Sequence, residues 1–312
     1  MASTKAIKQR IKSVKNTSQI TKAMEVVSAT KMRKSQAYAL SARPYALASL
    51  EMMQNLLART PAALMPPILS PRGVKMSCLL VVTSDKGLAG AFNGNVLKKA
   101  EAKLAEISRA ETPFVIMTVG KKAKEHFEKH GAPVARSFWG YGDYSTLAET
   151  SEVADALVAG FADGSWDEAW AVYMNFRSTL AQETAVKKIL PATEAGLEDA
   201  VRGILPERGR FAVPDEKPRG KTPPYRYEYK FEPSAGLILS ALVPQLIKMH
   251  IHHIILESNA SEHSARMVAM KSASDNAREL ITDLTLLYNN ARQAGITREL
   301  TEITAGREAL EN

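Results

Sequence analysis

The sequence predicts a mixed α/β protein, in which a long antiparallel coiled coil of the N- and C-terminal helices carries a central Rossmann-like open α/β sheet domain. Three observations support this. Residues 234–310 have helical spacing, with no glycine or proline between Pro244 and Gly295. Residues 4–58 form a second long helical pattern. Residues 77–190 alternate strand-length apolar runs with helical segments, which is typical of an open and mostly parallel sheet.

The C-terminal helix is too long to fit within a compact domain. About 50 residues at about 1.5 Å per residue extend roughly 75 Å, whereas a compact domain of this length has a radius of gyration of about 20 Å. Small and apolar residues recur along it in alternating steps of three and four, namely Ala273, Ala277, Leu280, Leu284, Leu287, Ala291 and Ala294. Such a stripe is the seam of a coiled coil and predicts a partner helix.

The N-terminal segment supplies that partner. Its apolar residues also fall on helical spacings, and Pro44 is the only helix breaker before the proline-rich linker of residues 61–71. These residues are Ile7, Ile11, Val14, Met24, Val27, Tyr38, Tyr45, Met52 and Leu56. We expect the two terminal helices to pair antiparallel, each covering the apolar stripe of the other.

The middle of the chain alternates strands and helices. We expect strands at residues 77–83, 113–119 and 133–139, helices at 93–109, 121–130 and 147–161, and a closing hairpin at 168–176 and 183–190.

The predicted domain boundaries follow from these elements. The segment at residues 192–224 is rich in proline, glycine and charge, so we expect an exposed insertion. Residues 225–231 alternate aromatic and charged residues as a strand does, and Ser234 is a candidate N-cap for the final helix. The domains are an N-terminal helix at 1–60, the α/β domain at 75–191, the insertion at 192–224, a strand region at 225–233 and the C-terminal helix at 234–312.

Charge is concentrated at the N-terminus. The formal net charge is +8, and Glu25 is the single acid among the many lysines and arginines of residues 5–34. Two classes of protein fit: a scaffold whose helical pair inserts into a socket of acidic partners, or a basic coiled-coil protein that binds nucleic acid. The basic residues are mostly lysines between serine, threonine and alanine, without aromatic or arginine platforms, which favours the socket.

The usual catalytic and nucleotide motifs are missing from the sequence. There is no G-x-x-x-x-G-K-[ST] and no G-x-G-x-x-G after a strand. Residues 87–90 have the sequence GLAG, for which a tight turn that needs glycine torsions is favoured over a phosphate site. Ser28 and Lys31 match S-x-x-K by chance, inside a helix without the companion motifs. We therefore expect no catalytic residue and no bound cofactor.

Two further groups of residues have structural interpretations. His250, His252, His253 and Glu257 have helical spacings that suit metal ligands, but without a second cluster a packed helix surface is favoured, and we expect no metal. The single cysteine, Cys78, lies in an apolar run and is expected to be buried. No uninterrupted run of 18 apolar residues occurs, and the start lacks an apolar signal region, so we expect no membrane span and no export.

Three stretches together resemble one known family. Residues 20–32 (ITKAMEVVSATKM), 84–90 (SDKGLAG) and 291–303 (ARQAGITRELTEI) resemble the γ subunits of F-type ATP synthases. The resemblance implies that the paired helices form a non-catalytic central stalk. This stalk turns inside a ring of α and β subunits, with catalysis on β, and its foot sits with the ε subunit on the proton-driven c-ring. It also implies membrane contact only through the c-ring, no nucleic acid as partner, and a peripheral place at the cytoplasmic face of a bacterial membrane.

The resemblance also implies positions for partner contacts. Near the tip of the stalk, the ring of α and β subunits would contact Arg292, Gln293, Thr297 and Glu299. Along the side of the stalk it would contact Met24, Lys31, Arg33 and Lys34. Near the lower rim of the ring it would contact Lys86. The foot would include Tyr227, Tyr229 and Glu232. The sequence departs from the family pattern at Ala89, where cysteine is frequent, and at Gly306-Arg307-Glu308, where small residues are usual.

Overall fold

A computed structural model describes residues 4–41, 43–57, 60–61, 65–141, 145–193, 196 and 232–311. The chain divides into two compact units. Met1–Ser28 and Arg266–Asn312 form the first, here called the helical unit, and Ala29–Ala265 form the second, here called the sheet unit. Most of residues 192–224 and all of the predicted strand at 225–231 lie outside the described residues.

The sheet unit is built on one five-stranded sheet with the order β3-β2-β1-β4-β5. The strands are β1 (Ser77–Val82), β2 (Phe114–Val119), β3 (Val134–Phe138), β4 (Glu168–Phe176) and β5 (Gln182–Leu190). The first four are parallel; Leu80, for example, lies opposite Met117 of β2 and Ala171 of β4. The fifth strand pairs antiparallel with β4, which confirms the predicted hairpin and the mostly parallel Rossmann-like layout.

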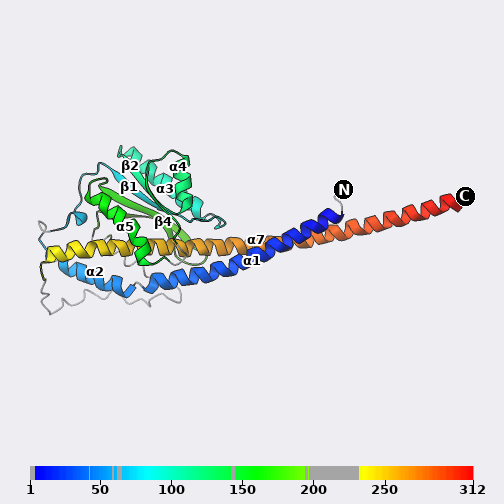
Figure 1. Ribbon diagram of the computed structural model, residues 1–312, viewed down its shortest axis with the longest axis horizontal. Coiled ribbons are helices and arrows are strands. Elements are labelled where there is room, and N and C mark those ends of the chain that lie inside the picture. The colour runs from blue at the N-terminus through cyan, green and yellow to red at the C-terminus, as the bar shows by residue number, and fades with distance from the viewer. Residues whose placement is uncertain are drawn as a thin grey trace. The chain divides into compact units, whose positions relative to one another are not determined.

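Alternate residues of β1 are buried on opposite faces of the sheet. Leu79 and Val81 join the core under α3 (Phe92–Arg109) and α4 (Lys121–Lys129). Cys78, Leu80 and Val82 join the core under α5 (Leu147–Ala162), α2 and the first part of α7. Figure 1 shows α3 and α4 on one side of the sheet and α5 with the first part of α7 on the other. Because both faces are covered, β1 is a continuous apolar run rather than an alternating one.

The N-terminal helical pattern forms two helices. They are α1 (Thr4–Ser41) and α2 (Arg43–Leu57), so the interruption falls next to Pro44, the only breaker in the segment. Pro44 is the second residue of α2, where its missing N–H would have no helical partner in any case.

The C-terminal helix α7 (Ala235–Glu311) is continuous over 77 residues and contains Pro244, Gly295 and Gly306. Ser234 caps it as predicted, since its Oγ accepts a hydrogen bond from the backbone N–H of Leu237 at 3.3 Å. Among the described residues, α7 is the one helix long and apolar enough to cross a membrane. Of its most apolar stretch, 56% is buried within the protein.

In the helical unit, α1 and α7 each carry a stripe of buried and half-buried residues that alternates strictly in steps of four and three. On α1 the stripe is Ile7, Ile11, Val14, Ser18, Thr21, Glu25 and Ser28. On α7 it is Met270, Ser274, Ala277, Ile281, Leu284, Tyr288 and Ala291. These spacings are those of a coiled coil.

The predicted seam was therefore wrong at Leu280, Leu287 and Ala294, whereas Ala273, Ala277, Leu284 and Ala291 are buried or half-buried. Leu284 is 9% exposed, but Leu280 and Leu287 are 39% and 52% exposed, and Ala294 is also exposed. Ile281 and Tyr288 take the positions assigned to the two leucines. Leu280 and Ile281 are adjacent and both apolar, as are Leu287 and Tyr288. The direction of the partner helix therefore decides which residue of each pair is buried. On α1, Val27 and Tyr38 are likewise exposed rather than in the stripe.

Candidate functional site

The loop between β1 and α3 lies at the point where the strand order reverses. Strand β1 has β2 on one side and β4 on the other, and in open α/β sheets the loops at such a point carry functional residues. The loop turns through left-handed backbone conformations at Leu88 (φ 62°) and Gly90 (φ 56°). The turn was predicted to use glycine torsions, and Gly90 does so, but its other left-handed residue is Leu88 rather than Gly87.

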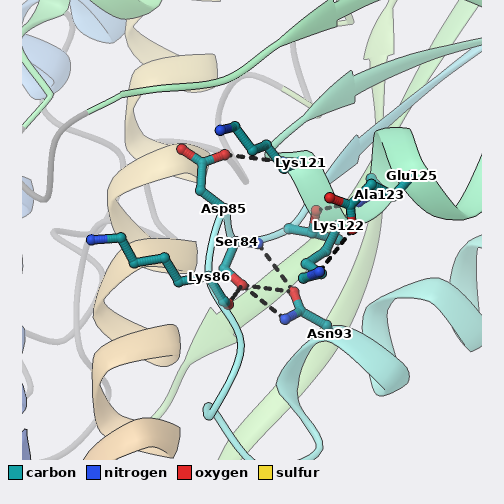
Figure 2. A network of polar contacts seen from close by, with 9 residues as sticks. Ser84, Asp85, Lys86, Asn93, Lys121, Lys122, Ala123 and Glu125 are labelled. Carbon is teal, nitrogen blue, oxygen red and sulfur yellow. Dashed lines mark hydrogen bonds and ion pairs between the residues drawn. The ribbon is translucent and has the colours of Figure 1, made fainter.

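Three consecutive residues of this loop satisfy the first turn of α4 (Figure 2). The Asp85 carboxylate accepts from Lys121 N at 2.9 Å, and the Ser84 carbonyl accepts from Lys122 N at 3.1 Å. The Thr83 hydroxyl accepts from Ala123 N at 2.9 Å. The first N–H groups of a helix have no partner within the helix, so these contacts fix the loop and α4 to one another.

The other end of the loop is held by Asn93, in the first turn of α3. Its Oδ1 accepts from Ser84 N at 3.1 Å, and its Nδ2 donates to Ser84 Oγ at 2.8 Å. The Ser84 hydroxyl in turn donates to the Lys86 carbonyl at 2.6 Å. The base of the loop is therefore tied both to its own following helix and to α4.

Lys86 and Leu88 are displayed from this fixed base. Both side chains are exposed, and Figure 2 shows the Lys86 amine extending away from Ser84 and Asn93. The arrangement presents one cation and one apolar side chain to a partner.

The histidine group on α7 does not converge on a ligand. His252 Nδ1 shares a 2.8 Å hydrogen bond with the Thr150 hydroxyl of α5, and His253 Nε2 lies 3.1 Å from Glu257 Oε1, one turn away. Burial, and then the neighbouring His253, lower the pKa of His252 to about 4. Within the described part of the chain, no group of three histidine, cysteine or acidic residues is arranged to hold a metal ion.

Cys78 is buried, as predicted. Burial raises the pKa of its thiol to about 12, so the reactive thiolate is not formed at neutral pH.

The end of α7 carries exposed apolar residues. From Arg292 to Arg307 every side chain is exposed, and Ile296, Leu300 and Ile303 follow one another in steps of four and three. A regular apolar stripe without cover is typical of a surface that binds another protein.

The predicted contact residues fall in both units. In the helical unit, Arg292, Gln293, Thr297 and Glu299 are exposed and Met24 is half-buried; the Thr297 hydroxyl donates to the Gln293 carbonyl at 3.0 Å.

In the sheet unit, Arg33 and Lys34 are exposed on α1 and Lys31 is half-buried. Glu232 is exposed before α7, whereas Tyr227 and Tyr229 lie outside the described residues. Two residues were not predicted from the sequence. Asp85 makes its contacts 36 and 55 residues away in the chain, and Asn93 bonds Ser84 nine residues before it. The only signal for Asp85 was its acidic side chain directly before Lys86.

Comparison with known proteins identifies the family. A sequence model described as ATP synthase matches residues 3–310. The ATP synthase gamma chain of a Synechococcus species is 39% identical over 99% of both chains. That of Pelotomaculum thermopropionicum is 38% identical over the whole of both chains.

Solved structures share the fold. A chain in the Euglena gracilis mitochondrial ATP synthase, in a structure titled OSCP/F1/c-ring, has a TM-score of 0.63 and 18% identity, covering 98% of this chain and 94% of that one. A chain in the central stalk/c-ring structure of the Tetrahymena thermophila enzyme has a TM-score of 0.55 and 19% identity, covering 82% and 99%. From the full-length sequence match, supported by the shared fold, we conclude that the chain belongs to the family of ATP synthase gamma chains.

Proposed function

We propose that the chain is the central rotor shaft of a proton-translocating ATP synthase, and that it transmits rotation of a c-ring to the catalytic subunits. The observation that carries this proposal is the exposed end of α7, where Ile296, Leu300 and Ile303 form a short apolar stripe of their own beyond the last buried residues of the coiled coil. A paired helix with a free apolar end suits a shaft that is held in a surrounding ring.

The chain itself is proposed to be non-catalytic. It would change the conformations of β subunits in sequence, because each orientation of the shaft makes different contacts with each subunit of the ring and so favours a different state. Synthesis or hydrolysis of ATP then takes place on β.

The ring contacts are assigned by position. Arg292, Gln293, Thr297 and Glu299 would meet ring loops at the end of α7. Met24, Lys31, Arg33 and Lys34 would follow the side of the shaft, where their mostly positive charge complements acidic loops. Lys86 would reach the lower rim of the ring.

The opposite end is proposed as the foot. Glu232, together with Tyr227 and Tyr229, would meet the ε subunit and the c-ring, so that the chain is a peripheral part of a membrane complex. We place it at the cytoplasmic face of a bacterial membrane. Its basic charge would then serve protein partners and not nucleic acid.

Deletion of residues 298–312 tests the function of the end of α7. The buried stripe ends at Ala291, so the truncated chain keeps its coiled coil and is expected to co-purify with α, β and ε subunits. ATP-driven proton pumping in membrane vesicles should fall much more than assembly does. A shorter deletion of residues 308–312 is the control. Unchanged pumping after the longer deletion would refute the role of this segment, and failure to co-purify even at full length would refute the assignment as a rotor.

A further inference from the structure

We propose that Asp85 is a positioning residue that holds the loop between β1 and α3 so that Lys86 is presented to a carboxylate of the surrounding ring. This inference rests on the proposed ring contact of Lys86. It assigns to Asp85 no contact with the ring.

The Asp85 carboxylate accepts one hydrogen bond on each of its two oxygens. Its Oδ1 accepts from Lys121 N, at the start of α4, at 2.9 Å. Its Oδ2 accepts from Gly140 N, just after β3, at 2.8 Å. One side chain therefore joins three segments that are separated by 36 and 55 residues in the chain.

Both contacts use charged acceptors and backbone donors, which makes them stronger than neutral hydrogen bonds. They also occupy both carboxylate oxygens, which are directed to the backbone N–H groups of Lys121 and Gly140. The ammonium group of Lys86 extends away from the network, as Figure 2 shows. A partner carboxylate can then pair with it without competition from Asp85.

The backbone beyond Lys86 must be held in place by contacts of this kind. Leu88 adopts φ 62°, a conformation that costs free energy for any residue with a Cβ atom and persists only where surrounding contacts impose it. Its side chain is exposed, so packing of that side chain does not impose it. The loop is instead held on both sides of Leu88, by the contacts of Ser84, Asp85 and Asn93 at its base and by the buried side chain of Ala89.

Loss of the two hydrogen bonds to the Asp85 carboxylate should leave the fold intact. Without the Asp85 carboxylate, α4 keeps its bonds from Lys122 N to the Ser84 carbonyl and from Ala123 N to the Thr83 hydroxyl. The expected change is local: the loop samples other conformations and Lys86 is no longer held in one orientation.

A double-mutant cycle in the assembled ATP synthase tests the proposal. Lys86→Ala, Asp85→Ala and the double variant are compared for ATP-driven proton pumping and for its dependence on salt. Each single variant is expected to reduce pumping about two- to fivefold, the effect of one partly exposed charge pair. The double variant should be no worse than Lys86→Ala, because Asp85 acts through Lys86.

Salt dependence separates positioning from general stability. Screening weakens an exposed ion pair, so the salt sensitivity contributed by Lys86 should be lost in both single variants. Asp85→Asn keeps one acceptor oxygen and should restore part of the pumping. Asp163→Ala, which removes an acceptor bonded to Ser165 N within its own turn, is the matched control and should behave as wild type.

The outcomes are distinct. If Lys86→Ala reduces pumping and Asp85→Ala does not, or if their effects add, the positioning role is wrong while the Lys86 contact stands. If Lys86→Ala has no effect, the Lys86 contact fails and the inference fails with it. If Asp85→Ala lowers the melting temperature of the isolated chain far more than Asp163→Ala does, its role is structural and the proposal is overturned.

Discussion

His252 on α7 and Thr150 on α5 share a hydrogen bond of 2.8 Å within the sheet unit. Thr150 is fully buried and His252 is half-buried. The bond ties a helix on the sheet to the long C-terminal helix, and it places a titratable group where its charged form is disfavoured.

The stability of the isolated chain should therefore depend on pH through His252. The pKa of His252 is about 4 in the folded chain and about 6.5 in the unfolded chain. Between these values the unfolded chain binds the additional proton, so the stabilisation is complete above about pH 6.5 and is lost as the pH falls toward 4. His252→Asn should flatten this dependence in urea unfolding measured at several pH values.

Thr150→Val is the control for the cause of that shift. It removes the hydrogen bond but keeps the burial that contributes most to the lowered pKa. The variant should be less stable at every pH while keeping the slope between pH 4 and 6.5. An unchanged slope in His252→Asn would contradict the assignment.

The register of the coiled coil can be tested with two leucines three residues apart. Leu284 lies in the buried stripe of α7, and Leu287 is 52% exposed. Leu284→Ala should lower the free energy of unfolding of the helical unit by about 2 kcal/mol, whereas Leu287→Ala should cost less than about 0.5 kcal/mol. Helicity followed by circular dichroism during heating measures both. Equal losses would show that the stripe runs between the two residues.

A second matched pair uses two glycines in different helices. A Cβ atom at Gly160 in α5 would collide with the Trp166 ring, which is held by a 3.1 Å hydrogen bond from its Nε1 to the Leu157 carbonyl. A Cβ atom at Gly94 in α3 meets nothing within 4 Å. Gly160→Ala should destabilise the sheet unit by about 1–3 kcal/mol, and Gly94→Ala should stabilise it by up to about 1 kcal/mol. The denaturant concentration at the midpoint of unfolding measures the effect of each substitution. Stabilisation by both substitutions would show that the Trp166 ring moves aside easily.

Arg72 joins the segment before β1 to the turn between α5 and β4. Its Nε lies 2.7 Å from Asp167 Oδ1, and its Nη2 donates to the Phe161 carbonyl at 2.8 Å and to the Trp166 carbonyl. The guanidinium also lies 4.2 Å from the centroid of the Phe161 ring.

Arg72→Lys should cost about 1–3 kcal/mol, since an ammonium cannot donate in these directions at once. Arg136→Lys on the exposed part of β3 is the control and should be neutral. Thermal unfolding measures both, and a neutral Arg72→Lys would mean that the charge alone suffices.

Much of this fold could be predicted because its signals are local. The apolar run at β1, the hairpin of β4 and β5, and the capping serine at 234 depend on neighbouring residues, and the structure confirms each. The seam could not be resolved, since Leu280 and Ile281 are equally apolar and only the partner helix distinguishes them. The role of Asp85 was also out of reach, because its bonds to Lys121 and Gly140 join residues that only the fold brings together.

The coiled-coil stripe in the helical unit includes Ser18, Thr21, Ser28 and Ser274, whose short side chains bury little apolar area. Pairing of the two helices is therefore weak per turn, and the end of α7 beyond Ala291 has no cover at all within the described chain. Binding of partner subunits would stabilise this end by mass action. A chain left without partners should fray there and be cut by proteases, which would keep its cellular amount matched to that of the complex.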